Sequence, residues 1–339
     1  MSLRKNVALV LSSGGPRGFA YIGAIEELER RGYRITSVSG CSVGSLVGGI
    51  YAAGGLQEFK HWLFSLDNFK IMSLLDPSIS TRYLVKGEKV INAIKTIVPD
   101  VNIEDMAIPF TAVATDLYTG EEVVFHEGKL FDAIRASISI PSMFRPVKYG
   151  HRTLVDGGIV NTFPLDKAVR NGDDILVGFD VNDVDSDAIK AFLTGQDSIK
   201  KEISSIEKDA ENLMESLRHS PQTSLIDKVK LAGSGGEQLI KQRLESGRKM
   251  REHHKEGVIG KVPVGADDNY YSILSRTFSL MNHTIAKLQA EAIKPDVLAK
   301  MNFDSYGTIM DYGRGEEISE KGRKIMADAL DKWESSEMG

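Results

Sequence analysis

Hydrophobic positions in the first half of the chain alternate between short apolar runs and helical spacing. Residues 7–11 form an apolar run typical of a buried parallel strand, and the apolar residues after it recur at helical intervals. The β-branched run 35–39 predicts a second strand, and the small apolar residues 46–53 predict a helix after it. The alternation continues to a buried strand over 174–181. We therefore expect an α/β fold in which a central, mainly parallel sheet lies between helices.

The pattern changes after Asn182, where polar and charged residues with helical periodicity replace the strands. One helix face collects six apolar side chains: Ile199, Ile203, Ile206, Ala210, Leu213 and Leu217. A strand over 295–298 and a closing helix over 318–333 follow. Three parts are predicted: a core over 5–185, a polar, largely helical insertion over 186–270, and a C-terminal strand and helices over 271–339 that complete the same domain.

Composition narrows the class of protein. The 339 residues carry a net charge of -5, which gives no sign of nucleic-acid binding and no overall attraction to anionic membranes. No apolar stretch approaches about 20 residues, so we expect no transmembrane helix. Cys41 is the sole cysteine, and strand alternation predicts that it packs away from the neighbouring Ser42. These features favour a cytoplasmic protein; secretion without a cleaved signal and the oligomeric state stay open.

Residues 40–44, with the sequence GCSVG, join the second predicted strand to its helix. This is the context of a nucleophile elbow, in which a serine at the apex takes a strained backbone conformation. Glycine two residues away on either side removes a Cβ that would crowd the turn. The helix amino terminus then lies beneath the hydroxyl, where its free N–H groups favour a developing oxyanion. The pattern predicts Ser42 as a nucleophile, against an ordinary tight turn.

A second glycine-rich segment, residues 12–18, joins the first strand to the helix that follows. Glycines at such a junction let backbone N–H groups converge on an anion. A dinucleotide-binding loop is disfavoured, because Pro16 stands at the third position of its motif, where a glycine is needed. A tight turn that needs glycine only for packing remains the alternative. Arg17 either clamps an anionic head group or pairs with a carboxylate.

Asp156 follows a short predicted strand over 153–155 and precedes Gly157 and Gly158. An aspartate at the carboxyl end of a strand, with glycines that give the backbone room, lies where open α/β sheets bind ligands. The alternative is an Asx-type turn, which an Asp-Gly pair also favours.

Together the three segments resemble the patatin-like phospholipase family, and the resemblance extends over most of residues 5–185, including 114–117 and 137–146. It implies a patatin-like three-layer fold and a lipid acyl hydrolase with a Ser-Asp dyad, in which Ser42 is the nucleophile and Asp156 the base. It also implies supporting positions: the oxyanion hole at Gly14, Gly15, Arg17 and Gly18, and the elbow and base motifs with Gly40, Gly44, Gly157 and Gly158. Two positions depart from the family: Ser13 replaces a further glycine, and Pro16 has no N–H to donate.

A Ser-His-Asp triad is the commoner way to activate a serine. Seven histidines are present, but none lies in a recognisable loop after a strand, and His151 lies at the opposite end of the short strand from Asp156. A histidine-free mechanism is therefore favoured, and no metal or cofactor is expected. Because an aspartate with an ordinary pKa of about 3.9 is a weak base at neutral pH, desolvation in an apolar pocket would improve it by raising that pKa.

We therefore expect a serine acyl hydrolase that cleaves lipid acyl esters, of the phospholipase A, lysophospholipase or esterase type. Two alternatives remain open: a lipid transacylase, with an acceptor alcohol in place of water, and a non-catalytic lipid-binding regulatory module. The expected partner is a lipid substrate, with peripheral contact to a membrane surface as a further option. The apolar face within 199–217 has three open uses: packing on the domain's own core, a dimer contact, or a lid that meets lipid.

Overall fold

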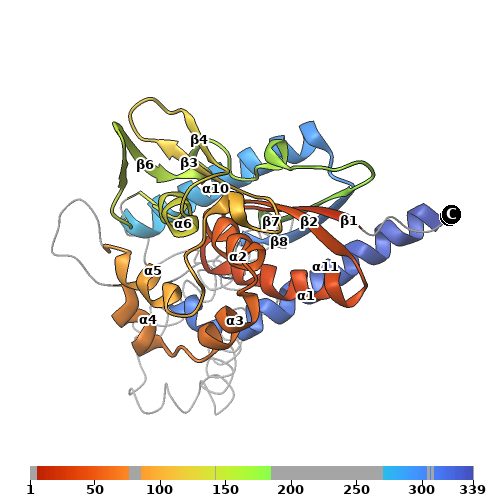
Figure 1. The fold of residues 1–339 in the computed structure, drawn as a ribbon, viewed down its shortest axis with the longest axis horizontal. Helices are drawn as coiled ribbons and strands as arrows, with labels where there is room; N and C mark the ends of the chain where they lie inside the picture. The colour runs from red at the N-terminus through yellow and green to blue at the C-terminus, as the bar shows by residue number, and fades with distance from the viewer. Residues whose placement is uncertain are drawn as a thin grey trace, which may run out of the picture. The chain divides into compact units, whose positions relative to one another are not determined.

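An eight-stranded sheet forms the centre of the fold (Figure 1). Its strands lie in the order β5-β6-β3-β2-β1-β7-β8, and β4 pairs with β3 outside this path. The strands are β1 Asn6–Leu11, β2 Arg34–Cys41, β3 Phe110–Asp116, β4 Glu122–Phe125, β5 Val147–Tyr149, β6 Arg152–Asp156, β7 Ile175–Asp183 and β8 Val297–Asn302. The pairings β3-β2, β2-β1, β1-β7 and β7-β8 are parallel. In contrast, β4 and β6 each pair antiparallel with β3, and β5 pairs antiparallel with β6. The expected α/β class with a mainly parallel sheet is confirmed.

The computed structural model describes residues 6–75, 85–141, 143–184, 270–303, 306 and 309–338. The helix predicted from the apolar face within 199–217 lies outside these ranges, and so do its three open uses. The described elements belong to one compact unit, which comprises residues 1–184 and 265–339. The division into a core, an insertion and a closing segment stays a prediction.

Helices flank both faces of the sheet. They are α1 Ala20–Arg30, α2 Val43–Ala52, α3 Leu56–Phe64, α4 Asn68–Leu75, α5 Glu88–Lys95, α6 Leu130–Ser137, α10 Tyr270–Ile293 and α11 Gly315–Met338. Short 3-10 helices are η1 Gly15–Phe19, η2 Ile103–Asp105, η3 Gly157–Ile159, η4 Leu165–Lys167 and η6 Ile309–Arg314. In Figure 1, α10 lies on one side of the central strands, and α1, α2 and α11 lie on the other.

The central strand β1 explains this layering. Val7, Leu9 and Leu11 join the main core, which also contains side chains of α1, α2 and α11. Ala8 and Val10 point the other way, into a smaller cluster that contains residues of α10 and η4. Side chains alternate between the two faces of a strand, so a strand that is apolar at every position has two faces to bury. The sheet is therefore covered on both sides.

Observed bounds differ from the predicted ones mainly at element ends. The helix expected from residue 46 begins at Val43, directly after the elbow serine. The second half of the glycine-rich loop itself forms the 3-10 helix η1, and α1 begins only at Ala20. The strand expected over 295–298 starts at Val297 and continues to Asn302. These shifts are of the size expected where capping, rather than apolar spacing, sets the end of an element.

The antiparallel strand β6 meets β2 end to end. Ala112 and Val113 of β3 pair with both β2 and β4, while Ala114 and Thr115 pair with both β4 and β6. Since a strand has two edges and β4 occupies one, β2 and β6 share the other. The last residue of β2, Cys41, pairs with Val113, and the last residue of β6 pairs with Ala114. The carboxyl ends of two strands that run in opposite directions therefore meet at one point.

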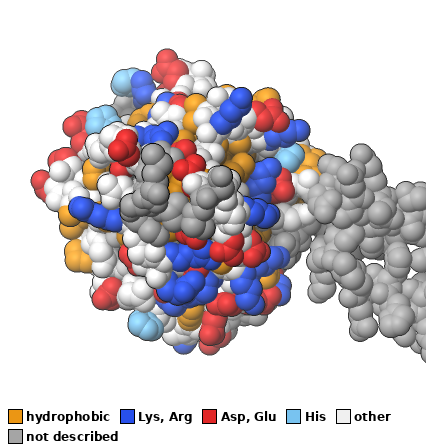
Figure 2. All heavy atoms as spheres, turned by 90° about the vertical axis from the view of Figure 1, so that its right-hand side faces the viewer, with side chains coloured by type: hydrophobic (Ala, Val, Ile, Leu, Met, Phe, Trp, Pro, Cys, Tyr) orange, Lys and Arg blue, Asp and Glu red, His pale blue; other side chains and the backbone are white. Residues whose placement is uncertain are grey.

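One face of the molecule shows acidic and basic side chains interspersed, with no large area of a single sign (Figure 2). Ion pairs join charged side chains of the described residues; Arg31, for example, pairs with Asp331 and Glu334 of α11. On this face the surface agrees with the modest net charge of -5.

Candidate active site

Ser42 stands at a sharp turn between β2 and α2. Its backbone has φ 54° and ψ -122°, a strained conformation for a residue with a side chain. A Cβ added to Gly40 would lie 2.4 Å from the carbonyl carbon of Gly44, and one added to Gly44 would lie 2.3 Å from the carbonyl oxygen of Leu11. Both glycines are therefore required sterically, and the turn has the geometry expected of an elbow.

The hydroxyl of Ser42 faces Asp156, the last residue of β6. Ser42 Oγ donates a hydrogen bond to Asp156 Oδ2 at 2.5 Å, and the two residues are 2% and 4% exposed. They are separated by more than 100 positions in the sequence, and the end-to-end meeting of β2 and β6 brings them together. A hydroxyl that donates to a buried carboxylate has a base in place for its proton.

Asp156 is held on all sides by short contacts. Its N–H donates to Ser139 O at 2.9 Å, and its carbonyl oxygen accepts from Thr115 Oγ1 at 3.0 Å. The second carboxylate oxygen, Oδ1, accepts from Gly158 N at 2.8 Å. A Cβ on Gly157 would lie 2.4 Å from Val113 O, so this glycine lets the chain turn tightly after the aspartate. Of the two carboxylate oxygens, Oδ2 is therefore the one positioned to accept the Ser42 proton.

The expectation that Cys41 points away from the site is wrong in one respect. Its side chain is buried, as predicted for a packing residue, but its Sγ lies 4.0 Å from Asp156 Oδ1. The carboxylate has two oxygens on opposite sides, so successive residues of the chain, Cys41 and Ser42, reach one each. Burial and the Asp156 charge together raise the pKa of the Cys41 thiol, which keeps it protonated.

Burial raises the pKa of Asp156 to about 6, well above the ordinary aspartate range. The hydrogen bonds from Ser42 and from the amide of Gly158 act in the opposite direction, because they stabilise the carboxylate. Desolvation is the larger effect. The carboxylate is therefore ionised at neutral pH and is a better proton acceptor than an exposed aspartate, as the sequence-based argument required.

Sequence reasoning assigned no role to Ser137, although it lies in a segment that carried the family resemblance. The amide of Ser42 donates to Ser137 Oγ at 2.8 Å, and that hydroxyl donates to Val113 O at 2.6 Å. Ser137 thus bridges the turn at Ser42 to β3 and occupies the backbone N–H of Ser42. A serine at the end of a helix has many uses, so only the fold identifies this one.

The glycine-rich loop lies beside the same hydroxyl. The amides of Ser12 and Ser13 are already bonded, to Phe179 O and Thr162 O, and Pro16 has no N–H. Gly15 has φ +58° and lines a cavity together with Ser42. The oxyanion-hole positions Gly14, Gly15, Arg17 and Gly18 stay predictions; Gly15 is the one that the structure brings to the wall of Ser42's cavity.

Arg17 does not have the setting of a head-group clamp, the first of its two expected roles. Its side chain is only 5% exposed, and its guanidinium donates to Phe303 O at 2.7 Å and Tyr306 O at 3.3 Å. It is also 3.5 Å from Asn182 Oδ1. A buried guanidinium bonded to carbonyl oxygens is not presented to a lipid head group. Arg17 instead fastens the C-terminal part of the chain to the glycine-rich loop.

An apolar cavity lies next to Ser42. Besides Gly15, Ser42 and Tyr312, it is lined by Phe19, Val43, Leu46, Phe59, Trp62, Leu63, Leu66, Ile71, Leu74, Val90, Ile94, Ile138, Ile140 and Phe144. Its volume is about 100 Å³, below the roughly 300–1,000 Å³ typical of small-molecule sites. A narrow hydrocarbon-lined space suits an acyl chain better than a polar head group.

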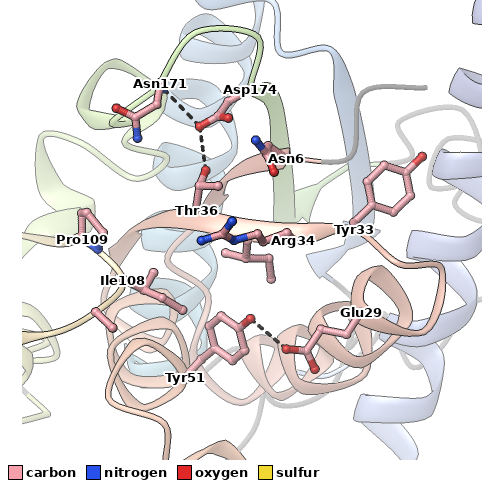
Figure 3. A pocket seen from close by; sticks show the side chains of 12 residues that line it. Asn6, Glu29, Tyr33, Arg34, Thr36, Tyr51, Ile108, Pro109, Asn171 and Asp174 are labelled. Atoms are coloured by element: carbon pink, nitrogen blue, oxygen red, sulfur yellow. Dashed lines mark hydrogen bonds between the residues drawn. The ribbon is translucent and has the colours of Figure 1, made fainter. Parts of the chain in front are cut away.

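A larger cavity of about 650 Å³ lies at the other end of the parallel strands (Figure 3). Its walls include Asn6, Arg34 and Pro109, at or just before the first residues of β1, β2 and β3. Figure 3 shows the hydroxyl of Thr36 directed at the carboxylate of Asp174, which also accepts a hydrogen bond from the backbone N–H of Asn171. Open α/β sheets bind ligands at the carboxyl ends of their strands, so this cavity is not the candidate active site.

The described histidines do not approach the dyad. His61, His126 and His151 are exposed, and Nδ1 of His283 is bonded to Asn182 O at 2.9 Å. Within the described ranges, no three acidic, histidine or cysteine side chains gather as a metal site would need. Across that same part of the chain, no helix combines the length and the hydrophobicity needed to cross a membrane.

Comparisons with known proteins find relatives for part of this chain. Residues 9–169 match the family model described as patatin-like phospholipase. An uncharacterized NTE family protein of Mycobacterium tuberculosis is 47% identical over 176 residues, which are 52% of this chain and 49% of that protein. Human patatin-like phospholipase domain-containing protein 6 is 31% identical over 198 residues, 55% of this chain and 14% of that protein.

The chain thus spans about half the length of the mycobacterial relatives and a smaller part of the human one. Among solved structures, VipD from Legionella pneumophila aligns with 97% of this chain and 68% of its own, at 13% identity and a TM-score of 0.42. The matched residues contain the glycine-rich loop, the elbow and Asp156. Residues 9–169 of this chain therefore form a patatin-like phospholipase domain.

Proposed function

We propose that this protein is a serine hydrolase that cleaves carboxylic ester bonds of lipids, of the phospholipase A, lysophospholipase or esterase type. The observation that carries the proposal is the 2.5 Å hydrogen bond from Ser42 Oγ to the buried Asp156 Oδ2, beside an apolar cavity. The patatin-like phospholipase match supports the substrate class, because the family acts on lipid esters.

In the acylation half of the reaction, Ser42 Oγ attacks the acyl carbonyl carbon while its proton passes to Asp156 Oδ2. The carbonyl π bond becomes an oxyanion, and a tetrahedral intermediate forms. When it collapses, the bond to the leaving alcohol breaks, and the alcohol oxygen takes the proton from Asp156. An acyl-Ser42 ester remains, and Asp156 is again a carboxylate.

In the deacylation half, a water molecule replaces the alcohol. The water oxygen attacks the acyl-Ser42 carbonyl carbon while Asp156 takes one proton from the water. When the intermediate collapses, Asp156 gives that proton to Ser42 Oγ. A fatty acid leaves and the dyad is restored. An acceptor alcohol in place of water would give transacylation on the same residues. The steps require no metal ion or cofactor.

Backbone amides of the glycine-rich loop supply the proposed oxyanion hole. Ser12 and Ser13 use their amides within the fold and Pro16 has none, so the donors are assigned to Gly14 and Gly15, with Arg17 and Gly18 next in the chain. Val43, as the first residue of α2, also has no partner for its N–H within that helix. Fixed donors of this kind stabilise the charge that develops on the carbonyl oxygen.

Covalent labelling tests the proposal. We expect a fluorophosphonate probe to modify wild-type protein at Ser42, located by mass spectrometry, and to leave Ser42→Ala unlabelled. Ser42→Ala should also abolish hydrolysis of a short activated ester while its melting temperature stays near that of wild type. Labelling at a different serine, or more than a few per cent of residual activity, would remove Ser42 from this role. Product analysis with added lysolipid or glycerol distinguishes hydrolysis from transacylation.

A further inference from the structure

Tyr312 belongs to the cavity of Ser42 although it lies far outside the matched residues 9–169. It sits on η6, and its ring lines the same apolar space as Ser42 and Gly15. A Cβ built on Gly15 would be 3.8 Å from the phenol oxygen of Tyr312. The hydroxyl group thus faces the backbone to which the oxyanion hole is assigned.

The phenol oxygen of Tyr312 differs from those of the other buried or half-buried tyrosines that the structure describes. Each of the others has a hydrogen-bond partner: Tyr21 with Ser12, Tyr33 with Glu334, Tyr51 with Glu29 and Tyr306 with Glu317. Within the described part of the chain, the Tyr312 hydroxyl has none. The hydroxyl is therefore free to donate to a ligand that enters the cavity.

The fold holds this phenol in position. The Tyr312 ring packs edge-to-face on Phe19, with ring centroids 5.8 Å apart. Arg17, two residues before Phe19, donates to the carbonyl oxygens of Phe303 and Tyr306, in the segment that leads to η6. The glycine-rich loop and the segment that presents Tyr312 are therefore fastened to each other by buried hydrogen bonds.

The phenol also keeps its proton at working pH. Burial raises the pKa of Tyr312 to about 12; the charge of Arg17 lowers it somewhat, and that of Asp156 adds to the rise. At neutral pH the group is an O–H donor that points into a cavity with no acceptor from the described protein. A carbonyl oxygen that becomes negative beside Gly15 is an acceptor of the right kind.

We infer that Tyr312 is a third catalytic group, whose phenol donates a hydrogen bond to the oxyanion formed beside Gly15 when Ser42 attacks an ester. The inference rests on the proposed function and adds a side-chain donor to the backbone donors. No proton is transferred from the phenol: the Ser42 proton goes to Asp156, and Tyr312 only stabilises the charge on the former carbonyl oxygen.

The test is Tyr312→Phe, which removes the oxygen atom and keeps the ring that packs on Phe19. We expect kcat to fall on the order of 10²-fold, the cost typical of losing one oxyanion donor, while KM changes less than about threefold. The fall should be equal for a p-nitrophenyl ester and an alkyl ester of the same acyl chain, because the oxyanion forms with either leaving group. Tyr33→Phe, which loses a phenol bonded to Glu334 elsewhere, is the matched control and should leave kcat unchanged.

Three outcomes overturn the inference. The first is an unchanged kcat. The second is a loss confined to the alkyl ester, which would make the phenol a proton donor to the leaving group. The third is an equal loss in Tyr33→Phe. Ser42→Ala in the same assay distinguishes a failure of the role of Tyr312 from a failure of the proposed function. If wild type is active and depends on Ser42 while Tyr312→Phe is unaffected, only the inference fails; if activity does not depend on Ser42, the proposed function fails with it.

Discussion

The two ends of β2 each carry a hydroxyl bonded to a buried aspartate, and only one pair has the setting of an active site. Ser42 Oγ donates to Asp156 Oδ2 at 2.5 Å at the carboxyl end, and Thr36 Oγ1 donates to Asp174 Oδ2 at 2.6 Å near the amino end. Asp156 and Asp174 are 4% and 0% exposed. The hydrogen bond and the burial alone therefore do not distinguish a nucleophile from a structural hydroxyl.

The surroundings make the difference. Ser42 is at a strained turn, with the start of α2 behind it and hydrocarbon walls in front. Thr36 lies within β2, at the position where the pairing with β1 shifts register, and it borders a cavity that Asn6 and Arg34 make polar. A bulge redirects a side chain, but it supplies no set of free N–H groups for an oxyanion. The larger cavity, at the amino end of β2, therefore lacks the groups needed to stabilise an oxyanion.

The largest expected effect is the loss of the base at the carboxyl end. Asp156→Asn keeps the size of the side chain but cannot accept the Ser42 proton, so kcat/KM on a short ester should fall by about 10²- to 10⁴-fold. The matched change at the other end, Asp174→Asn, should alter kcat/KM by less than about twofold. Steady-state kinetics of the two purified variants measures both. A similar loss in both variants would mean that the asymmetry between the two ends is not catalytic.

A smaller effect is expected from pH. In the proposed mechanism Asp156 acts as a carboxylate. Since its pKa is raised to about 6, kcat/KM of wild type should rise about tenfold per pH unit up to pH 6 and level off above it. Because the pKa of Asp156 is raised, the rising part of the pH profile ends at a higher pH than it would with an ordinary aspartate as the base. A pH profile that levels off near pH 4 instead would contradict the conclusion that burial raises the pKa of Asp156.

The same pKa shift has a consequence for stability, with the opposite sign to a salt-bridged aspartate. Because the folded pKa exceeds the unfolded one, the folded state binds more protons between about pH 4 and pH 6, and stability falls as pH rises through that window. Asp156→Asn lacks this ionisation. Its free energy of unfolding relative to wild type should therefore improve between pH 4 and pH 7, by at most about 3 kcal/mol, in urea titrations.

The smallest effect is expected at the amino end. Thr36→Val removes the hydroxyl that bonds Asp174, while Asn171 N still donates to the same carboxylate oxygen. Unfolding free energy should fall by about 1 kcal/mol, the usual net cost of one hydrogen bond, and kcat/KM should stay within about twofold of wild type. A tenfold fall in activity with normal stability would show that the two ends of β2 are coupled, and the comparison would need revision.

Residues 7–183 show how far sequence reasoning reaches. The strand before the glycine-rich loop, the strand and helix around Ser42 and the short strand before Asp156 were all predicted within a few residues. Apolar spacing and paired glycines carry these predictions, because both act over a few residues. The directions of Cys41 and Arg17 were not obtained, since each depends on contacts more than 100 positions away.

The sequence by itself determined the elbow at Ser42, the glycine-rich loop and the candidate base. Glycines mark the positions where the backbone must turn sharply or pack closely, and this requirement is local. Only the tertiary structure decided that β6 runs antiparallel along the same edge of β3 as β2, so that Asp156 arrives at Ser42 from the opposite direction. The tertiary structure also decided that Tyr312 faces the cavity. Such meetings depend on how the whole sheet buries both of its faces, and no segment of the chain encodes that alone.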